Sequence, residues 1–427
     1  MKDTFQGSDG PEHHDPSGTR DVRLIALGRG VSFAGDLVAA NALVLHAYDR
    51  GWGTPGVAAV MVAAGAPLIL GAPVAGRTVD RTGSHRLTLA AALWEGCCAG
   101  LLVLLTALAG DGPLPVAGIL LLIFALGCGQ AVSGPAWSAL VPSAVPREEV
   151  GRAVATVQSA TSLAMIAGPA LAGLLVATWG VAAALAADTA SFGVLLLVAA
   201  GLRTRRRPRP GDGPESDGPW AGATVLRRDP VLGPLVGGLL ILVLSLHAVL
   251  VVEVFMVREV LGGTSRDYGL MGTVLATFLL LGSVAGRAID DETGRVRGVL
   301  AAIAVIPVAV LAGAFAGDLM AFAAVMAVLG AADGVLNVSL NSLLLLRVPG
   351  ALRGRALAVF AGGVQACNLA GSAVGGPLGS AFGPRTVFLA TGALGVVTAS
   401  GVLLACRSLP AVRGRAPAAP GTPTAPL

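Results

Sequence analysis

Long apolar stretches dominate this chain of 427 residues and return at short intervals from one end to the other. A helix of about twenty apolar residues crosses the hydrocarbon core of a bilayer, which is ~30 Å thick. We expect spans at 24–47, 56–75, 87–109, 114–140, 151–177 and 179–202, then at 231–257, 268–288, 297–316, 319–346, 354–381 and 385–407. The sequence therefore predicts an all-α integral membrane protein with twelve transmembrane helices in two sets of six.

The composition also indicates a surface that faces lipid. Hydrophobic residues make up 54% of the chain, charged residues only 13%, and the mean hydropathy is +0.78. Soluble domains carry about 25% charged residues, so a water-soluble protein this apolar could not cover its surface. The net charge of +4 lies in short loops and not on one face, so nucleic acid is not an expected partner. The five cysteines lack metal-ligand spacing, and we expect no metal and no cofactor.

The distribution of positive charge predicts the orientation. With both termini in the cytoplasm, 25 of the 29 lysine and arginine residues fall in inner segments, and four remain outside at Arg50, Arg258, Arg266 and Arg385. Positively charged loops stay on the cytoplasmic side, so this count favours cytoplasmic termini and an even number of spans. Abundant alanine, glycine and arginine with a single lysine is typical of a GC-rich bacterial genome. We therefore expect a multi-pass protein of a bacterial plasma membrane.

Polar segments divide the chain into five parts. The stretch RTRRRPRPGDGPESDGPW interrupts the apolar pattern with proline, glycine and charge, which is typical of a mobile linker. The final residues, GRAPAAPGTPTAPL, are of low complexity. We expect a disordered cytoplasmic N-terminus at 1–20, a six-helix bundle at 21–202, a cytoplasmic linker at 203–228, a second six-helix bundle at 229–407 and a disordered cytoplasmic tail at 408–427.

Two internal similarities indicate that the halves are repeats of one unit. VAGRTVDRTG at 74–83 returns as VAGRAIDDETG at 284–294, each copy between the second and third spans of its set. Residues 126–155 align without a gap on residues 329–358, and both segments contain LG, VP and GRA at matching places. Parallel six-helix repeats with both termini on one side are typical of transporters whose two bundles enclose a site near the bilayer midplane.

The first copy of this phrase resembles a known motif. GRTVDRTGSHR resembles the loop motif G-x-x-x-D-R-x-G-R-R of the major facilitator superfamily of transporters, with Gly76, Asp80, Arg81, Gly83 and Arg86 on the motif positions. In that superfamily the loop latches the two bundles together on the inner face, and the latch opens during transport. The resemblance implies that Asp80 and Arg81 are gating residues and that Asp290 is the counterpart in the second half.

A second motif extends the resemblance to roughly residues 20–407. AGPALAG at 167–173 is similar to the glycine–proline motif of the drug:proton antiporter branch. Pro169 removes an intrahelical hydrogen bond, and Gly168 and Gly173 admit a neighbouring helix closely, so this segment is either a hinge or a packing kink. Many drug:proton antiporters carry an arginine in the fourth span, where this chain has Gln130. The overall pattern is most similar to macrolide and siderophore exporters of the superfamily.

Polar side chains inside the spans are the candidates for a substrate and proton cavity. An ionised aspartate at the centre of a membrane helix costs about 2.5–3.5 kcal/mol on insertion scales, so each one needs a reason. The candidates are Asp36, Gln130, Ser133, Trp137, His247, Glu253, Asp333, Asn337 and Asn341. They lie on spans one, four, seven and ten, which the resemblance implies line the central cavity. The alternative is that these side chains make only structural hydrogen bonds.

The acidic residues differ in their expected roles. A carboxyl group removed from water favours its protonated form and can bind and release a proton near neutral pH. Asp36 is our first candidate for proton coupling and Asp333 the second. Glu95 and Asp188 lie on spans three and six, which pack outside the cavity lining in the family, and either could pair across a helix interface.

These features predict a secondary active transporter that works by alternating access. We expect proton-coupled efflux of a small amphipathic organic molecule, such as a drug, an antibiotic or a siderophore-like compound, because apolar walls with few polar groups suit such molecules. The alternatives are an importer of a small metabolite on the same fold and a membrane sensor without transport. No Ser/His/Asp constellation, HExxH, Walker loop or redox pair is evident, so an enzyme is not expected. The expected partners are the substrate, protons and the lipid bilayer, and the expected state is a monomer.

Overall fold

The computed structural model describes residues 16–82, 84–108, 113–202 and 221–407. Within these ranges the chain is helical and contains no strand. The long helices are α1 (Pro16–Asp49), α2 (Gly53–Thr82), α3 (Ser84–Leu108), α4 (Pro113–Leu140), α5 (Val150–Gly201), α7 (Leu232–Phe255), α8 (Ser265–Arg287), α9 (Glu292–Gly313), α10 (Leu319–Arg347) and α11 (Arg353–Cys406). Short helical segments lie between them: α6 (Ala221–Arg228), η1 (Val141–Ser143), η2 (Arg147–Glu149), η3 (Met256–Val260) and η4 (Gly350–Leu352).

Helices α5 and α11 each cross the membrane twice. They contain 52 and 54 residues, and at 1.5 Å per residue each would extend to ~80 Å, far beyond the ~30 Å apolar core. Each breaks at a glycine with positive φ, at Gly180 (φ 80°) and Gly383 (φ 76°), a conformation that only glycine adopts without steric cost. Ten described helices are long and apolar enough to cross a membrane. With these two breaks they make twelve crossings, which confirms the predicted fold class.

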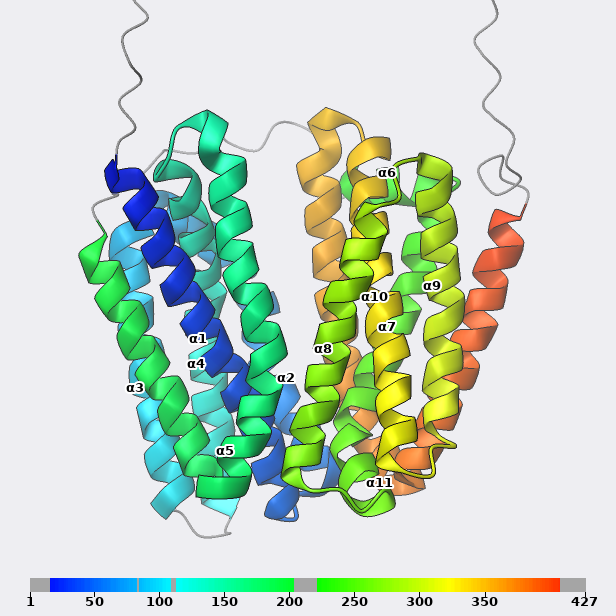
Figure 1. Ribbon diagram of the computed structural model, residues 1–427, viewed down its shortest axis with the longest axis horizontal. Coiled ribbons are helices and arrows are strands. Elements are labelled where there is room, and N and C mark those ends of the chain that lie inside the picture. The colour runs from blue at the N-terminus through cyan, green and yellow to red at the C-terminus, as the bar shows by residue number, and fades with distance from the viewer. Residues whose placement is uncertain (1–15, 83, 109–112, 203–220, 408–427) are drawn as a thin grey trace, which may run out of the picture.

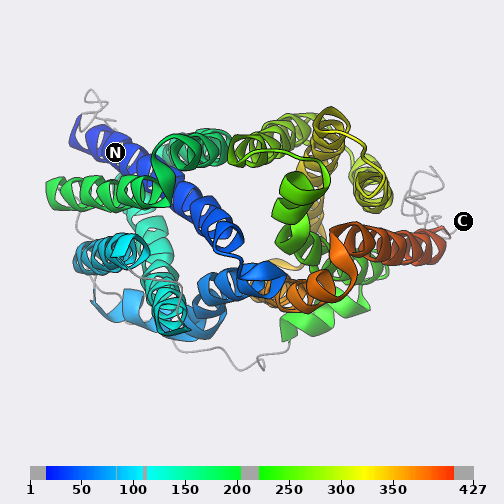
Figure 2. The same cartoon turned by 90° about the horizontal axis from the view of Figure 1, so that it is seen from below.

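The two halves are built in the same way. Helices α1 to α5 form one group and α6 to α11 the other, and Figures 1 and 2 show the groups side by side. In the first half α1 packs on α5, and α2 packs on α4. In the second half α7 packs on α11, and α8 packs on α10. Corresponding helices therefore have corresponding neighbours, as the predicted duplication requires.

The halves contact each other through α5 with α8 and through α2 with α11. We call the end where α1 begins and α11 ends the terminal end, and the opposite end, with Gly180 and Gly383, the far end. In Figure 1 the ribbons of the two halves meet at the far end and diverge toward the terminal end. Hydrogen bonds join the halves, from Thr54 Oγ1 to the Gly376 carbonyl (2.7 Å) and from Thr273 Oγ1 to the Ile166 carbonyl (3.1 Å). The structure is therefore closed at its far end.

Large apolar side chains cover the outside of the helices. Leu104, Leu121, Leu197, Leu281 and Leu404 are each more than half exposed. An apolar surface of this extent is a liability in water, whereas in a bilayer it faces lipid chains. The structure thus supports a multi-pass membrane protein.

The polar segments differ from the sequence-based expectation in two places. Pro16 is already helical, so part of the expected disordered N-terminus at 1–20 belongs to α1. The last residues of the expected linker form α6, an eight-residue helix that packs on α11. Gly222 makes this contact possible, because a Cβ at this position would lie 2.7 Å from the Arg355 carbonyl oxygen. Residues 1–15, 203–220 and 408–427, the rest of the expected tails and linker, lie outside the described residues.

Candidate functional site

The first-half cavity contains Asp36 from α1, Gln130 from α4 and Asp188 from α5, and its volume is about 220 Å³. Gln130 Nε2 donates a hydrogen bond to Asp36 Oδ1 (2.8 Å). Asp188 is 1% exposed and lies directly against α1 at Gly35, where a Cβ would be 2.6 Å from Asp188 Oδ1. The predicted residues Asp36 and Gln130 therefore meet in one cavity, and Asp188 joins them.

Glu95 of α3 completes a carboxyl cluster, which we define as Asp36, Glu95 and Asp188. Glu95 is 1% exposed, and its Oε1 atom has no hydrogen-bond partner among the described residues. It interacts electrostatically with Asp36, and Asp188 interacts with both of the other acids. Sequence reasoning left Glu95 and Asp188 outside the site. Their position in the sequence could have identified them, because each lies well inside its predicted span, as Asp36 does.

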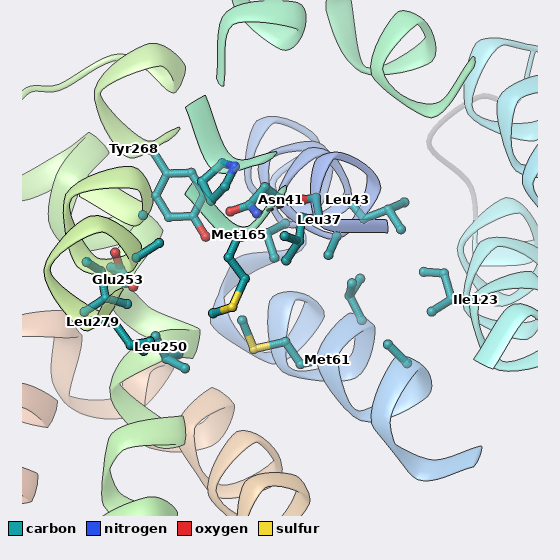
Figure 3. Close-up of a pocket in the computed structure, with 18 residues that line it drawn as sticks. Leu37, Asn41, Leu43, Met61, Ile123, Met165, Leu250, Glu253, Tyr268 and Leu279 are labelled. Carbon is teal, nitrogen blue, oxygen red and sulfur yellow. Dashed lines mark hydrogen bonds between the residues drawn. The ribbon is translucent and has the colours of Figure 1, made fainter. Parts of the chain in front are cut away.

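The interface cavity lies between the halves and has a volume of about 330 Å³. Figure 3 shows Glu253 and Tyr268 on one side, with Met61 and Met165 toward the centre. Asn41 Nδ2 donates to the Leu37 carbonyl (2.8 Å), and most of the remaining wall is aliphatic. Methionine is flexible and fills irregular space, so this cavity suits an apolar body of variable shape beside a few polar groups.

The second-half cavity has a volume of about 450 Å³ and the most polar lining of the three. Its polar residues are His247 from α7, Asp333, Asn337 and Asn341 from α10, and Gln365 and Asn368 from α11. The α10 residues are spaced by four, which places them on one helix face, and Asn337 Nδ2 donates to Asp333 Oδ1 (2.9 Å). Sequence reasoning missed the two α11 amides, although both are polar residues inside a predicted span.

Two of the predicted cavity residues do not line a cavity themselves. Ser133 is 3% exposed, and Trp137 is 2% exposed within the hydrophobic core of the first half, beside Ile25 and Phe192. Neither lines the three cavities described above. Of the polar stripe expected on α4, Gln130 lines the first-half cavity and Ser133 interacts with Glu95 of the carboxyl cluster. Trp137 packs in the core of its own half.

The predicted gating residues are only partly described. Gly83 lies outside the described residues, and of Gly76, Asp80 and Arg81 the structure describes the backbone, which continues α2 as far as Thr82. The motif expected in a loop thus begins inside a helix. Arg86 is exposed in the first turn of α3.

In the second copy of the motif, Asp291 caps a helix and Asp290 does not. Asp291 precedes α9, and its Oδ2 atom accepts a hydrogen bond from the Gly294 amide (3.0 Å). Asp290 is exposed in the turn before it. A carboxylate is favoured at this position because the helix dipole and the free amide groups attract an anion.

At the terminal end of the second half, a charge network joins the end of α10 to the starts of α7 and α9. Sequence reasoning missed this network. Arg347, at the end of α10, pairs with Asp229 (3.1 Å) and with Glu292 in the first turn of α9. The Val231 and Leu232 amides also donate to Asp229, each at 2.8 Å. Partial burial works to raise the pKa of Asp229, but these amides and Arg347 outweigh it and hold the pKa below 3.8.

The glycine–proline segment lies where the halves meet. A Cβ on Gly168 would be 2.6 Å from the Leu37 Cβ atom, and one on Gly173 would be 2.7 Å from the Ser265 carbonyl oxygen of α8. Pro169 lines the interface cavity. Because these glycines have no side chains, the backbone of α5 contacts the Leu37 side chain of α1 and the backbone of α8.

The far end is closed by a small group of charged and aromatic side chains. Arg258 pairs with Asp49 (3.3 Å), and its guanidinium lies 5.2 Å from the centre of the Tyr48 ring. Tyr48 also contacts Phe255 edge to face, at 5.1 Å between ring centres. Asp49 and Tyr48 belong to the first half, and Arg258 and Phe255 belong to the second. These contacts hold the halves together on the far side of the interface cavity.

Comparisons with known proteins agree with this arrangement. Residues 35–420 match the sequence model of a family described as transmembrane secretion effector, whereas no curated protein matches the chain significantly. A mutant of the nucleoside transporter NupG has a TM-score of 0.73 at 10% identity, over 91% of this chain and 99% of that one. A bacterial homologue of the iron transporter ferroportin, in an inward-facing state, has 0.72 at 15% identity, over 90% and 98%. A bacterial homologue of the human lysosomal transporter Spinster, inward-facing and unoccupied, has 0.71 at 15% identity, over 95% and 100%.

Proposed function

Because the chain belongs to the transmembrane secretion effector family of the major facilitator superfamily, we propose that it exports a small amphipathic organic molecule in exchange for protons. The chain is a membrane transporter by family and fold. The direction, the coupling and the substrate class are the proposed part. One observation carries the coupling: the apolar interface cavity and the cavity that contains Asp36 share a wall.

The shared wall consists of Leu37, Ala40, Leu43, Ala64 and Ile123, each of which lines both cavities. Leu37 follows Asp36 directly in α1. A substrate that presses on this wall therefore moves the same turn of helix that carries Asp36. A change in the protonation of Asp36 shifts the same wall in return. Substrate binding and proton binding then affect each other, as coupling requires.

The carboxyl cluster is suited to hold a proton. Neighbouring carboxyl groups in a medium of low dielectric repel each other strongly when all are ionised, so at least one of them tends to keep a proton. Gln130 provides Asp36 with a neutral hydrogen-bond donor (2.8 Å), and Arg29, two turns earlier on α1, attracts the ionised forms of Asp36 and Glu95 from a distance. The described residues form no ion pair with Asp36, so a proton can bind and leave without breaking one.

The interface cavity favours an amphipathic substrate. Its walls are mostly aliphatic, with two methionines, and the acid Glu253 and the phenol Tyr268 face it from the second half. The family description, a secretion effector, supports export over import. If the termini are cytoplasmic, the structure is inward-facing, because the halves meet at the far end and diverge at the terminal end.

The test is accumulation of a fluorescent amphipathic dye in inverted vesicles under an imposed pH gradient. We expect wild type to move the dye only with the gradient, and Asp36→Asn to move none. Asp318→Asn is the matched control, because Asp318 caps α10 at the far end and asparagine caps a helix equally well. Equal transport by wild type and Asp36→Asn would remove Asp36 from the coupling mechanism. Dye uptake by right-side-out vesicles would favour an importer, and ligand binding without any flux would favour a sensor.

A further inference from the structure

Most of the polar atoms in the second-half cavity are hydrogen-bond acceptors, and the clear exception is Gln365 Nε2, whose partner oxygen Oε1 already accepts from Asn368. Asn337 Nδ2 donates to both the carbonyl and the Oδ1 atom of Asp333 (3.0 and 2.9 Å), and Asn341 Nδ2 donates to the Asn337 carbonyl (2.8 Å). Carbonyl oxygens only accept, so these contacts fix the orientation of both amides. The side-chain oxygens of Asn337 and Asn341 are left for the cavity, which their exposed side chains face.

Two further residues add acceptors from the facing helices. His247 Nδ1 lies 3.2 Å from the Val243 carbonyl, which can only accept, so Nδ1 carries the hydrogen and the neutral ring presents Nε2 as an acceptor. Asn368 Nδ2 donates to Gln365 Oε1 (2.8 Å), and Asn368 Oδ1 is buried without a partner among the described residues. A buried acceptor without a donor is costly, and a donor that enters the cavity, from water or from a ligand, would remove this cost.

Asp333 is the only acid that lines this cavity, and the described part of the chain shows no ion pair to it. A membrane-buried carboxylate without a cation is unstable unless a proton or a cationic ligand neutralises it. Asp333, Asn337 and Asn341 follow each other by one helical turn, so their oxygens extend over about 12 Å along α10. A single inorganic ion, whose ligands lie within about 2.6 Å, cannot contact all three.

We propose that the second-half cavity binds a protonated amine of the transported molecule, with Asp333 as the counter-ion and the oxygens of Asn337, Asn341 and Asn368 as hydrogen-bond acceptors. An ammonium group has three donors and no acceptor, which complements this lining. Hydroxyl or amide N–H groups on the same molecule occupy the acceptors farther along α10. This inference rests on the proposed transport function and names the polar part of its substrate.

The geometry of α7 connects this polar site with the apolar one. Val243 and Leu246 line the second-half cavity, whereas Leu250 and Glu253 line the interface cavity. Positions 243, 246, 250 and 253 follow one face of a helix. A molecule with its amine at Asp333 can therefore extend its apolar body along α7 toward the interface cavity.

A matched pair of probes tests the proposal on the purified full-length protein in lipid nanodiscs. Dansylcadaverine carries an apolar fluorophore and a protonated primary amine, and its N-acetyl derivative carries an uncharged acetamide in place of that amine. We expect wild type at neutral pH to bind the amine at least about tenfold more tightly than the acetylated probe, because a hydrogen-bonded charge pair is lost. Asp333→Asn should abolish this preference while affinity for the acetylated probe is unchanged, and Asp318→Asn should keep it.

A second variant keeps the test decisive if Asp333→Asn does not fold. Asn341→Leu preserves the side-chain size but removes an acceptor, and we expect it to weaken binding of the amine several-fold. Equal affinity of wild type for the two probes, or no binding of either, overturns the proposal. Calorimetric binding of Na⁺ alone that depends on Asp333, with equal probe affinities, assigns the cavity to an inorganic ion and also overturns it. Amine-selective binding without dye flux would contradict the proposed export but support this amine site. Dye flux with equal affinities for the two probes would support export and contradict the amine site.

Discussion

Replacing Gly35 with alanine should destabilise the protein, because α1 and the second part of α5 touch at this residue. The added Cβ would lie 2.6 Å from Asp188 Oδ1 and 2.8 Å from Ser191 Cβ, whereas real Cβ atoms essentially never approach within 3.0 Å. Asp188 and Ser191 are 1% and 4% exposed, so neither can turn away into solvent. Overpacking of this kind costs about 1–3 kcal/mol.

The assay is thermal unfolding of the purified protein, with Gly193→Ala as a matched control. Gly193 lies on the same segment of α5, but a Cβ there meets nothing within 4 Å. Alanine in a helix interior is about 0.5–1 kcal/mol more favourable than glycine, so the control should be neutral or slightly stabilising. We expect Gly35→Ala to lower the melting temperature by a few degrees and Gly193→Ala not to lower it.

The same substitution should also affect coupling, because the displaced Asp188 belongs to the carboxyl cluster. We expect Gly35→Ala to change the pH dependence of dye transport in the fraction that remains folded. A Gly35→Ala protein that unfolds at the wild-type temperature and transports with the wild-type pH dependence would refute the described contact between α1 and α5. Destabilisation by both alanine substitutions would show that any added methyl group is harmful in this part of the protein, whatever its contact distances.

Three further predictions concern the far end, the terminal end and the core. Arg258→Gln removes the ion pair with Asp49 and the contact with Tyr48, together worth about 1 kcal/mol. This loss should enlarge the population that is open at the far end about fivefold, as measured by spin-label distances between the start of α2 and the middle of α11. The pKa of Asp229 is held below 3.8 in the folded protein, so its stabilisation is complete above that pH and is lost as the pH falls through the lowered value. Acid unfolding should therefore be less pH-dependent below pH 3.8 in Asp229→Asn than in wild type, and an identical dependence would contradict the network. Trp137→Phe should lower stability modestly with the KM for dye unchanged, since Trp137 lies in the core; a large rise in KM would return this residue to the substrate path.

The membrane spans were predictable because local sequence decides them. The breaks at Gly180 and Gly383 lie within about two residues of the gaps expected after 177 and 381. In lipid, each backbone amide and carbonyl must find its partner within the helix, so an apolar run of sufficient length has few alternatives to crossing. Helix α6 escaped prediction because it is only eight residues long, and its contact with α11 depends on residues far away in the sequence.

The candidate site was only partly predictable. Asp36, Gln130 and the α10 stripe were identified because polar groups inside apolar runs stand out. Glu95 and Asp188 were set aside since their spans pack outside the cavity lining in related transporters. The α11 amides of the second-half cavity were missed because weakly polar residues in an apolar run are also common at ordinary helix contacts.

The sequence by itself determined the number of crossings, the duplication and the fold class, because these follow from run length, the break-forming glycines and similarity between segments. Only the tertiary structure decided which polar residues share a cavity and which end of the molecule is closed. Those outcomes depend on the rotation and tilt of each helix, and close contacts between distant residues set both, as Gly35 does with Asp188. Identical spans turned by one residue would separate Asp36 from Gln130, and the run lengths would not change.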